Sequence, residues 1–391
     1  MAAKGKKRRL GRALAMAVSL IALSSGIAAA QDANDLESLN QEILNNPSDV
    51  QLNLRYARLA EQEGKLRLAL VAYERILIND PTNEAARRGY ERIRREIEPS
   101  YTVFRAEIGA RWDTNAVNAD ADALFVDADE LEATTYYAHM MIADEREFLG
   151  RRWRSAINLD IERTPDIDEL DYQYLGVQTG PIFYVAPHLA LIPQVGAGIS
   201  WLDGEQYYND VHANVTLEGR TGGSSYWVRA RAGYRDYNPD TFSFFSTVTE
   251  EGPYAEVRAG IAKPRVFSER DAVHVEPFVR WSDVEGSQFS FWLLDDVAPG
   301  KYFEYGADIR YQYQFGDHFQ GAGGLYIRER DFGDSRREDT YVSPYVSLTW
   351  QDALPCECDL RLQYRYRDND SNDTIANYDA DQVSLALLAR F

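Results

Sequence analysis

The residues with the clearest chemical potential in this sequence are charged side chains at every second position. Arg229 and Arg231 alternate with apolar residues in one stretch, and Arg361 and Arg365 do so in another. Alternate residues of a β-strand share a face, so each stretch predicts one charged face and one apolar face. Such a charged face can line a polar conduit that attracts ions, or its charges can pair and stiffen a wall.

The same period predicts a larger set of charged residues on one side of a sheet. We expect the lumen-lining residues to be Arg105, Glu107, Arg111, Arg154, Asp160, Arg229, Arg231, Glu276, Arg280, Arg310, Arg361 and Arg365. Because both signs occur in this set, we expect a mixture of paired, structural charges and charges that face a conduit.

Catalytic chemistry is not expected. The histidines, which belong to no recognisable motif of nucleophile and base, are His139, His188, His212, His274 and His318. Cys356 and Cys358 are the only cysteines, and a metal site would need two further ligands, none of which lies nearby in the sequence. We predict no enzyme activity, no metal site and no cofactor, and either a short disulfide or two free thiols at the cysteines.

Residues 1–30 have the features of a cleaved signal peptide. Six basic residues precede an apolar core from Leu14 to Leu23, and three alanines ending at Ala30 fit a cleavage site. Because this segment carries six positive and no negative charges, its removal changes the formal net charge from -20 to -26. Such an acidic chain is not expected to bind nucleic acid. The acidity is compatible with a cation-attracting interior or with acidic loops.

Residues 31–100 have the period of helices and contain an internal repeat. The stretch Ile43–Asp49 recurs as Leu77–Asn83 after 34 residues, which is the tetratricopeptide period. We therefore expect a small tetratricopeptide-like helical domain. Its helices are predicted near residues 35–45, 49–62, 65–78 and 82–97.

This helical domain has two possible roles. It can brace the domain that follows, or it can dock a protein or polymer in the periplasm. For the docking role, the candidate residues are Arg55, Tyr56 and Tyr73, although Tyr73 can equally be a core residue.

From Tyr101 onward the period changes from that of a helix to that of a strand. The chain closes on an alternating stretch in which Val383, Leu385 and Leu387 share a side, and it ends on Phe391. Bacterial outer-membrane barrels use such a stretch as their last strand. We predict fourteen strands, near residues 101–113, 134–146, 151–163, 171–184, 189–202, 207–219, 224–237, 251–263, 271–283, 301–315, 319–331, 338–351, 358–368 and 377–391.

The predicted fold is an all-β transmembrane barrel of about 14 antiparallel strands in residues 101–391, preceded by the all-α domain. The mean hydropathy of -0.45 fits strands that are apolar on one face only. The connections alternate between short turns and mostly longer loops, and short turns are typical of the periplasmic side. We expect the protein in the outer membrane of a Gram-negative bacterium, with the helical domain in the periplasm.

Two short motifs resemble those of the surface lipoprotein assembly modifier (Slam) family. The stretch Trp112–Asn118 is similar to the family's Asp-Ser-Asn-x-Asn segment, and Asp370–Asn372 with Asn377–Asp379 is similar to its last hairpin. The order of signal peptide, helical repeats and barrel also resembles this family. The resemblance implies an outer-membrane protein that helps lipoproteins reach the cell surface.

The resulting functional expectation is translocation or surface display of a substrate protein, with the helical domain docking that substrate. The alternatives are a polysaccharide-secretion porin and a general diffusion porin. The expected partners are outer-membrane lipid, the barrel-assembly machinery during biogenesis, and a periplasmic substrate protein.

Overall fold

The computed structural model describes residues 36–80, 83–97, 100–186, 188–221, 223–238, 251–284, 300–333, 336–354, 356 and 358–390. The chain divides into two compact units, Met1–Pro99 and Ser100–Phe391. The signal peptide predicted over residues 1–30 lies outside the described residues, and so does the terminal Phe391.

The helical unit consists of short helices around small core residues. Its elements are a helix over residues 36–45, α2 (Val50–Gln62), α3 (Leu66–Asn79) and α4 (Glu84–Ile97). Asp49 caps α2, since its side chain accepts a hydrogen bond from the Leu52 amide. Ala57 and Ala69 are fully buried between the helices, where small side chains permit close packing. No helix in the described residues is long and apolar enough to cross a membrane.

The structure places two of the three candidate docking residues in the core of this unit. Tyr56 is 8% exposed and Tyr73 is 3% exposed, because both rings pack among the apolar side chains of the helices. Burial, together with a hydrogen bond to Glu61, raises the pKa of Tyr73 to about 12. Arg55 remains exposed. The tyrosines therefore act as packing residues, and only Arg55 lies on the surface.

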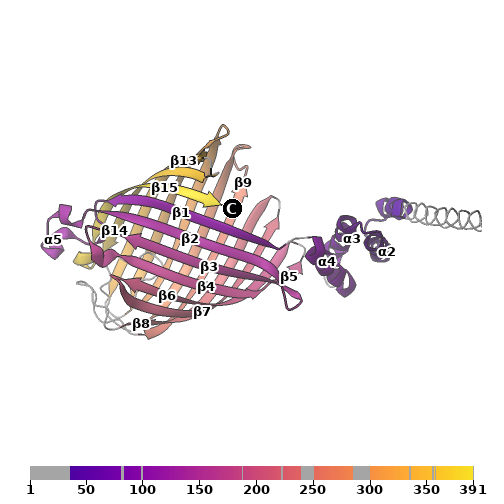
Figure 1. Ribbon diagram of the computed structural model, residues 1–391, viewed down its shortest axis with the longest axis horizontal. Coiled ribbons are helices and arrows are strands. Elements are labelled where there is room, and N and C mark those ends of the chain that lie inside the picture. The colour runs from indigo at the N-terminus through magenta and orange to yellow at the C-terminus, as the bar shows by residue number, and fades with distance from the viewer. Residues whose placement is uncertain are drawn as a thin grey trace, which may run out of the picture. The chain divides into compact units, whose positions relative to one another are not determined.

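The second unit is a closed antiparallel barrel (Figure 1). Its strands are β1 (Tyr101–Asp113), β2 (Ala133–Phe148), β3 (Arg151–Arg163), β4 (Tyr172–Pro181), β5 (Phe183–Ala186), β6 (Leu189–Leu202), β7 (Glu205–Thr221), β8 (Ser224–Tyr237), β9 (Glu251–Pro264), β10 (Asp271–Asp283), β11 (Lys301–Phe315), β12 (Phe319–Phe332), β13 (Arg337–Leu354), β14 (Cys358–Ser371) and β15 (Tyr378–Arg390). The last strand pairs with β1, so the sheet has no free edge.

The fifteen strands make a fourteen-stranded barrel because β4 and β5 together occupy the position of one strand. Both strands pair with β6, and the strand conformation is interrupted between them at Ile182. The Ile182 amide donates a hydrogen bond to the Arg152 carbonyl, which continues the ladder toward β3. The predicted fold class, with fourteen antiparallel strands after a small helical region, is confirmed.

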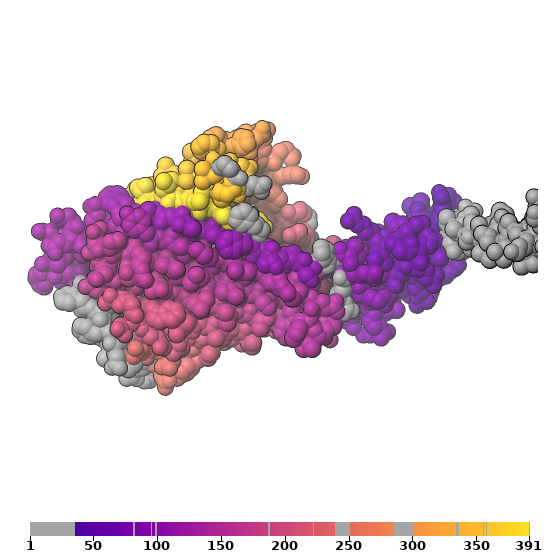
Figure 2. Space-filling model, in the orientation of Figure 1, coloured from indigo at the N-terminus to yellow at the C-terminus, as the bar shows by residue number. Residues whose placement is uncertain are grey.

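The outer face of the barrel is apolar. Exposed apolar side chains at outward positions include Ile108, Val346, Leu348 and Leu385. The side chains of strands β1 to β4 form a continuous outer wall (Figure 2). Exposed aromatic residues lie toward the two ends of this face; they are Trp112, Trp281 and Phe303 at one end and Phe315, Phe319 and Trp350 at the other. An apolar band between aromatic girdles is the surface of a membrane-spanning barrel.

The motifs that resemble the Slam family meet at one end of the barrel. The long connection after β1 contains α5 (Ala121–Leu124) and η1 (Ala128–Leu131), and packs Val117 and Leu131 against Ile375 of η3 (Thr374–Ala376). Arg367 of β14 links the connection after β1 to the barrel wall, since its guanidinium donates a hydrogen bond to the Asn115 carbonyl oxygen at 2.9 Å. In this structure, these motifs hold a loop in place.

Candidate functional site

Three cavities in the interior of the barrel are bordered by described residues and have volumes of about 340, 620 and 560 Å³. We call them the first, second and third cavity. His139 lines all three, Tyr172 lines the first and second, and Arg231 lines the second and third. Because neighbouring cavities share wall residues, they adjoin one another inside the barrel. Their walls are built by alternate residues of the strands, which point inward while the apolar set points outward.

Ten of the twelve predicted lumen-lining residues border these cavities. Glu107, Arg111, Arg361 and Arg365 line the first cavity, Asp160, Arg229, Arg231, Glu276 and Arg280 line the second, and Arg105 lines the third. The remaining two are Arg154 and Arg310. Arg154 is tied to Glu218, with Nη2 and Oε1 2.7 Å apart, and Arg310 lies opposite His274 in the β10–β11 register.

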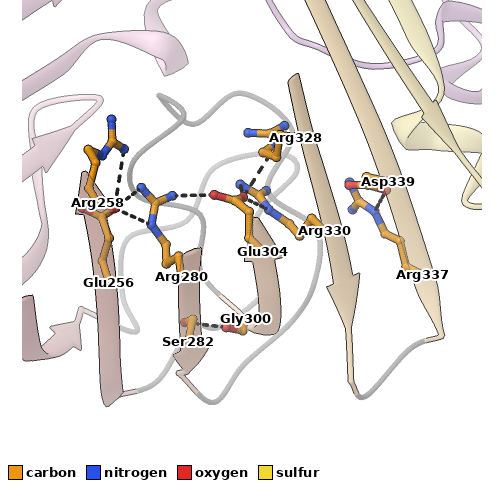
Figure 3. A network of polar contacts seen from close by, with 10 residues as sticks. All are labelled: Glu256, Arg258, Arg280, Ser282, Gly300, Glu304, Arg328, Arg330, Arg337 and Asp339. Atoms are coloured by element: carbon orange, nitrogen blue, oxygen red, sulfur yellow. Dashed lines mark hydrogen bonds and ion pairs between the residues drawn. The ribbon is translucent and has the colours of Figure 1, made fainter. Parts of the chain in front are cut away.

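A ladder of alternating charges crosses the inner wall from β9 to β13 (Figure 3). The strand registers place Glu256, Arg280, Glu304, Arg330 and Asp339 in one row. The Arg280 guanidinium lies 2.7 Å from Glu256 Oε2 and 3.0 Å from Glu304 Oε1. Arg330 Nε donates to Glu304 Oε2 at 2.6 Å. These contacts link the four adjacent strands β9 to β12 on the inner face of the barrel.

Glu304 is the centre of this ladder. It is 0% exposed, and a third arginine, Arg328, lies 3.8 Å from its Oε2. A fully buried carboxylate is tolerated only when it is paired and hydrogen-bonded, and here three guanidinium groups surround it. Glu304, Arg328 and Arg330 were absent from the predicted lumen set, although Glu304 has the strand period of Arg310. Only the register between strands shows that these side chains meet.

A second set of ion pairs surrounds the first cavity. Four carboxylates line it, and each is bonded to an arginine of the same wall. The pairs are Arg111 with Glu162, Arg361 with Glu107, Arg367 with Asp113, and Arg337 with Asp339. The carboxylates of the first cavity are therefore paired with arginines of the wall, and the lining of the cavity is polar.

Glycines on the inner wall give aromatic rings room to lie flat. Tyr174 projects from β4 over Gly176 of its own strand and Gly198 of β6. A Cβ atom at Gly198 would lie 2.5 Å from the Tyr174 hydroxyl oxygen, well inside van der Waals contact. Because Tyr174 lines the second and third cavities, these glycines keep its ring against the wall and out of the lumen.

Replacing Gly198 with valine is therefore expected to displace the Tyr174 ring from the wall. We expect a destabilisation of about 1–3 kcal/mol from overpacking and a lower ion conductance per barrel. Single-barrel currents in planar bilayers and denaturant unfolding measure the two effects. The control is Gly323→Val, because the nearest atom to a Cβ at Gly323 is 3.9 Å away. Equal effects of the two substitutions would contradict this role of Gly198.

The two cysteines form a local crosslink outside the cavities. Cys356 and Cys358 are joined by a disulfide in the connection between β13 and β14. Within the described residues, no group of three or more histidine, cysteine or carboxylate side chains is arranged to hold a metal ion.

Part of the chain is similar to a family of porins. Residues 296–391 match the family described as "Putative beta-barrel porin 2". No curated protein matches the sequence. Among solved structures, the outer membrane channel DcaP of Acinetobacter baumannii is 9% identical at a TM-score of 0.45, with 75% of this chain and 97% of that chain covered. OmpT of Vibrio cholerae is 8% identical at a TM-score of 0.41, with 75% and 100% covered.

The closed barrel, its apolar outer band and its polar interior define the class of protein as an outer-membrane β-barrel. Residues 296–391, which contain β11 to β15, are similar to that porin family, and the match covers this part of the barrel alone.

Proposed function

We propose that this protein is a diffusion porin that lets small polar solutes cross the outer membrane. The observation that carries the proposal is the interior, where three adjoining cavities are bordered by charged side chains. Several of these side chains are only half-buried and face the cavities, namely Arg229, Arg231, Glu276, Arg361 and Arg365. Fourteen strands leave more interior space than eight, which side chains just fill. The partial match to a porin family adds support.

Translocation or display of a substrate protein, which the resemblance to the Slam family suggests, has less support. That function needs a docking surface on the helical unit, and Tyr56 and Tyr73 are buried in its core. Polysaccharide secretion lacks a specific observation in its favour. The diffusion porin is therefore the function that the described side chains support best.

We also propose that the helical unit lies in the periplasm. It precedes Tyr101, and the register places Tyr101 beside Glu145, close to the short turn at Leu149 and Gly150 that joins β2 to β3. Short turns lie on the periplasmic side of such barrels.

A liposome-swelling assay tests the porin function. We expect vesicles that contain the purified full-length protein to swell in an isotonic solution of a small neutral sugar, at a rate that rises with the amount of protein. Protein-free vesicles and vesicles with boiled protein are the controls. An intact, folded barrel that leaves the swelling rate at the protein-free level would refute the proposal.

A deletion of the gene separates this function from protein export. We expect the set of surface-exposed proteins, measured by protease shaving and mass spectrometry, to stay unchanged. If specific surface proteins disappear and return with the full gene, but not with a gene that lacks residues 35–98, export is the main function.

A further inference from the structure

The residues that line the first and second cavities carry a net charge opposite to that of the whole chain. The protein carries a formal net charge of -20. The residues that line the first and second cavities nevertheless include twelve arginines and eight carboxylates, and no lysine. We propose that the pore selects anions, and that small organic carboxylates are its substrate class. This inference rests on the proposed porin function and deepens it.

Of the seven arginines that line the first cavity, Arg365 is the one without a carboxylate partner among the described residues. All four lining carboxylates are bonded to other arginines, and Arg328 and Arg330 converge on Glu304. Arg365 donates to the Ser343 hydroxyl at 3.2 Å and lies over the Tyr345 ring, 4.9 Å from its centre. In the described part of the chain, no carboxylate lies within 4.0 Å of Arg365. Its charge therefore faces the cavity.

The second cavity contains two more arginines of this kind. Arg229 and Arg231 project from β8 two residues apart, and the described residues place no carboxylate within 4.0 Å of either. Arg229 Nε lies 3.4 Å from the Thr216 hydroxyl, and Arg231 Nε is a buried atom without a hydrogen-bond partner. Both guanidinium groups retain donors for a solute.

The carboxylates of the second cavity are mostly engaged by wall residues. Asp160 is bonded to His139, Asp210 accepts from His212 and Tyr254, and Glu256 is paired with Arg280. Glu276 alone among the four has no ion pair or hydrogen bond within the described residues. A hydrogen bond to a histidine or tyrosine leaves the charge of a carboxylate in place, so the balance is set by the count of twelve arginines against eight carboxylates. We therefore expect a positive potential in the two cavities, strongest near Arg229, Arg231 and Arg365.

The geometry of the arginine side chain also explains why we expect carboxylates, rather than other anions, to be the substrates of the pore. A guanidinium is planar, stays charged at every physiological pH, and binds a carboxylate through two parallel hydrogen bonds. Arg229 and Arg231 side by side can receive a solute in this way as it passes. The second cavity, of about 620 Å³, falls in the size range of sites for small molecules.

Reversal potentials of the full-length protein in planar bilayers test the inference. Under a KCl gradient we expect the wild type to be permeable to chloride over potassium. In R229Q/R231Q/R365Q, which removes three charges, we expect the ratio of these permeabilities to fall by at least about fivefold, the factor that a single charge at contact distance in water supplies. The substitution leaves no carboxylate unpaired, so the barrel is expected to fold. The variant Glu276→Gln, which removes a negative charge from the second cavity, is expected to raise the ratio.

With dipotassium succinate in place of KCl, we expect the wild type to conduct succinate and the triple variant to conduct less of it.

The control variant is Arg265→Gln, in the connection between β9 and β10, where the side chain is exposed and paired with Glu269. We expect it to keep the wild-type ratio. Channels that prefer potassium, or an unchanged ratio in a folded triple variant, would overturn anion selectivity while leaving the porin function intact. A folded wild-type protein without any current would instead overturn the porin function. Chloride selectivity without succinate current would refute the carboxylate substrate class alone.

Discussion

Replacement of Glu304 with glutamine is expected to destabilise the folded barrel by about 3–5 kcal/mol, the cost of removing one partner from a buried ion pair. Glu304 is fully buried and joins Arg280 of β10 to Arg330 of β12 across its own strand, β11. Glutamine has nearly the same shape but no charge. The guanidinium groups of Arg280, Arg328 and Arg330 would lose the carboxylate between them and repel one another.

Urea unfolding in phospholipid vesicles, followed by tryptophan fluorescence, measures this loss. The matched control is Glu338→Gln on β13, whose exposed side chain should change the free energy of unfolding by no more than about 0.5 kcal/mol. Because Glu304 and Arg330 are coupled, E304Q/R330Q should lose less than the sum of the two single variants. Equal unfolding midpoints for Glu304→Gln and the wild type would show that the ladder does not hold the strands.

Replacement of Val346 with arginine is expected to destabilise the barrel in a membrane by about 2–4 kcal/mol, the cost of an arginine on the lipid face near the bilayer midplane. Val346 is 58% exposed at the middle of β13, between outward-facing Pro344 and Leu348. A charged group there would meet hydrocarbon, where no water solvates it.

The neighbouring residue provides the matched control. Ser347 points to the opposite face of β13, beside Ala322 and Gln363 on the inner wall. We expect Ser347→Arg to leave the free energy of unfolding in vesicles within about 1 kcal/mol of the wild type and to alter conductance instead. If both substitutions destabilise the protein equally, the assignment of outer and inner faces is wrong.

The sequence predicted the strands and their faces well because a strand has a period of two and each face meets a different solvent. Arg361 and Arg365 alternate with Leu360, Leu362 and Tyr364, so the inward side follows from the pattern once a barrel is assumed. The same reasoning works for Arg229 and Arg231 on β8. The predicted strand over 171–184 is interrupted at Ile182, directly after Gly180 and Pro181. A proline cannot donate to the ladder of hydrogen bonds, so this local signal favours a break that the predicted strand did not include.

What the sequence could not give is the register between strands. Arg361 pairs with Glu107, 254 positions away in the sequence, because β15 lies between β14 and β1 in the closed sheet. Whether a lumen arginine is neutralised or faces the cavity depends on such pairings, so Arg111 and Arg365 look alike in the sequence and differ in the structure. The overall acidity likewise misleads about the lumen, since a sum over all residues ignores which face each one occupies.

The helical unit shows a related limit. The helical period and the repeat spacing predicted the helices, but Tyr56 was a candidate docking residue, which requires it to lie on the surface. Aromatic residues in a small helical unit are usually needed in the core, because few large apolar side chains are available to fill it. Tyr56 and Tyr73 follow that rule here.

The most direct test of the central claim, that the interior is a conducting polar path, is the current through single barrels of the purified full-length protein in a planar lipid bilayer. We predict discrete, uniform current steps in KCl that require folded protein and that grow in proportion to salt concentration. Folded, inserted barrels that give no current steps would contradict the account and would leave the charges of the inner wall with a structural role only.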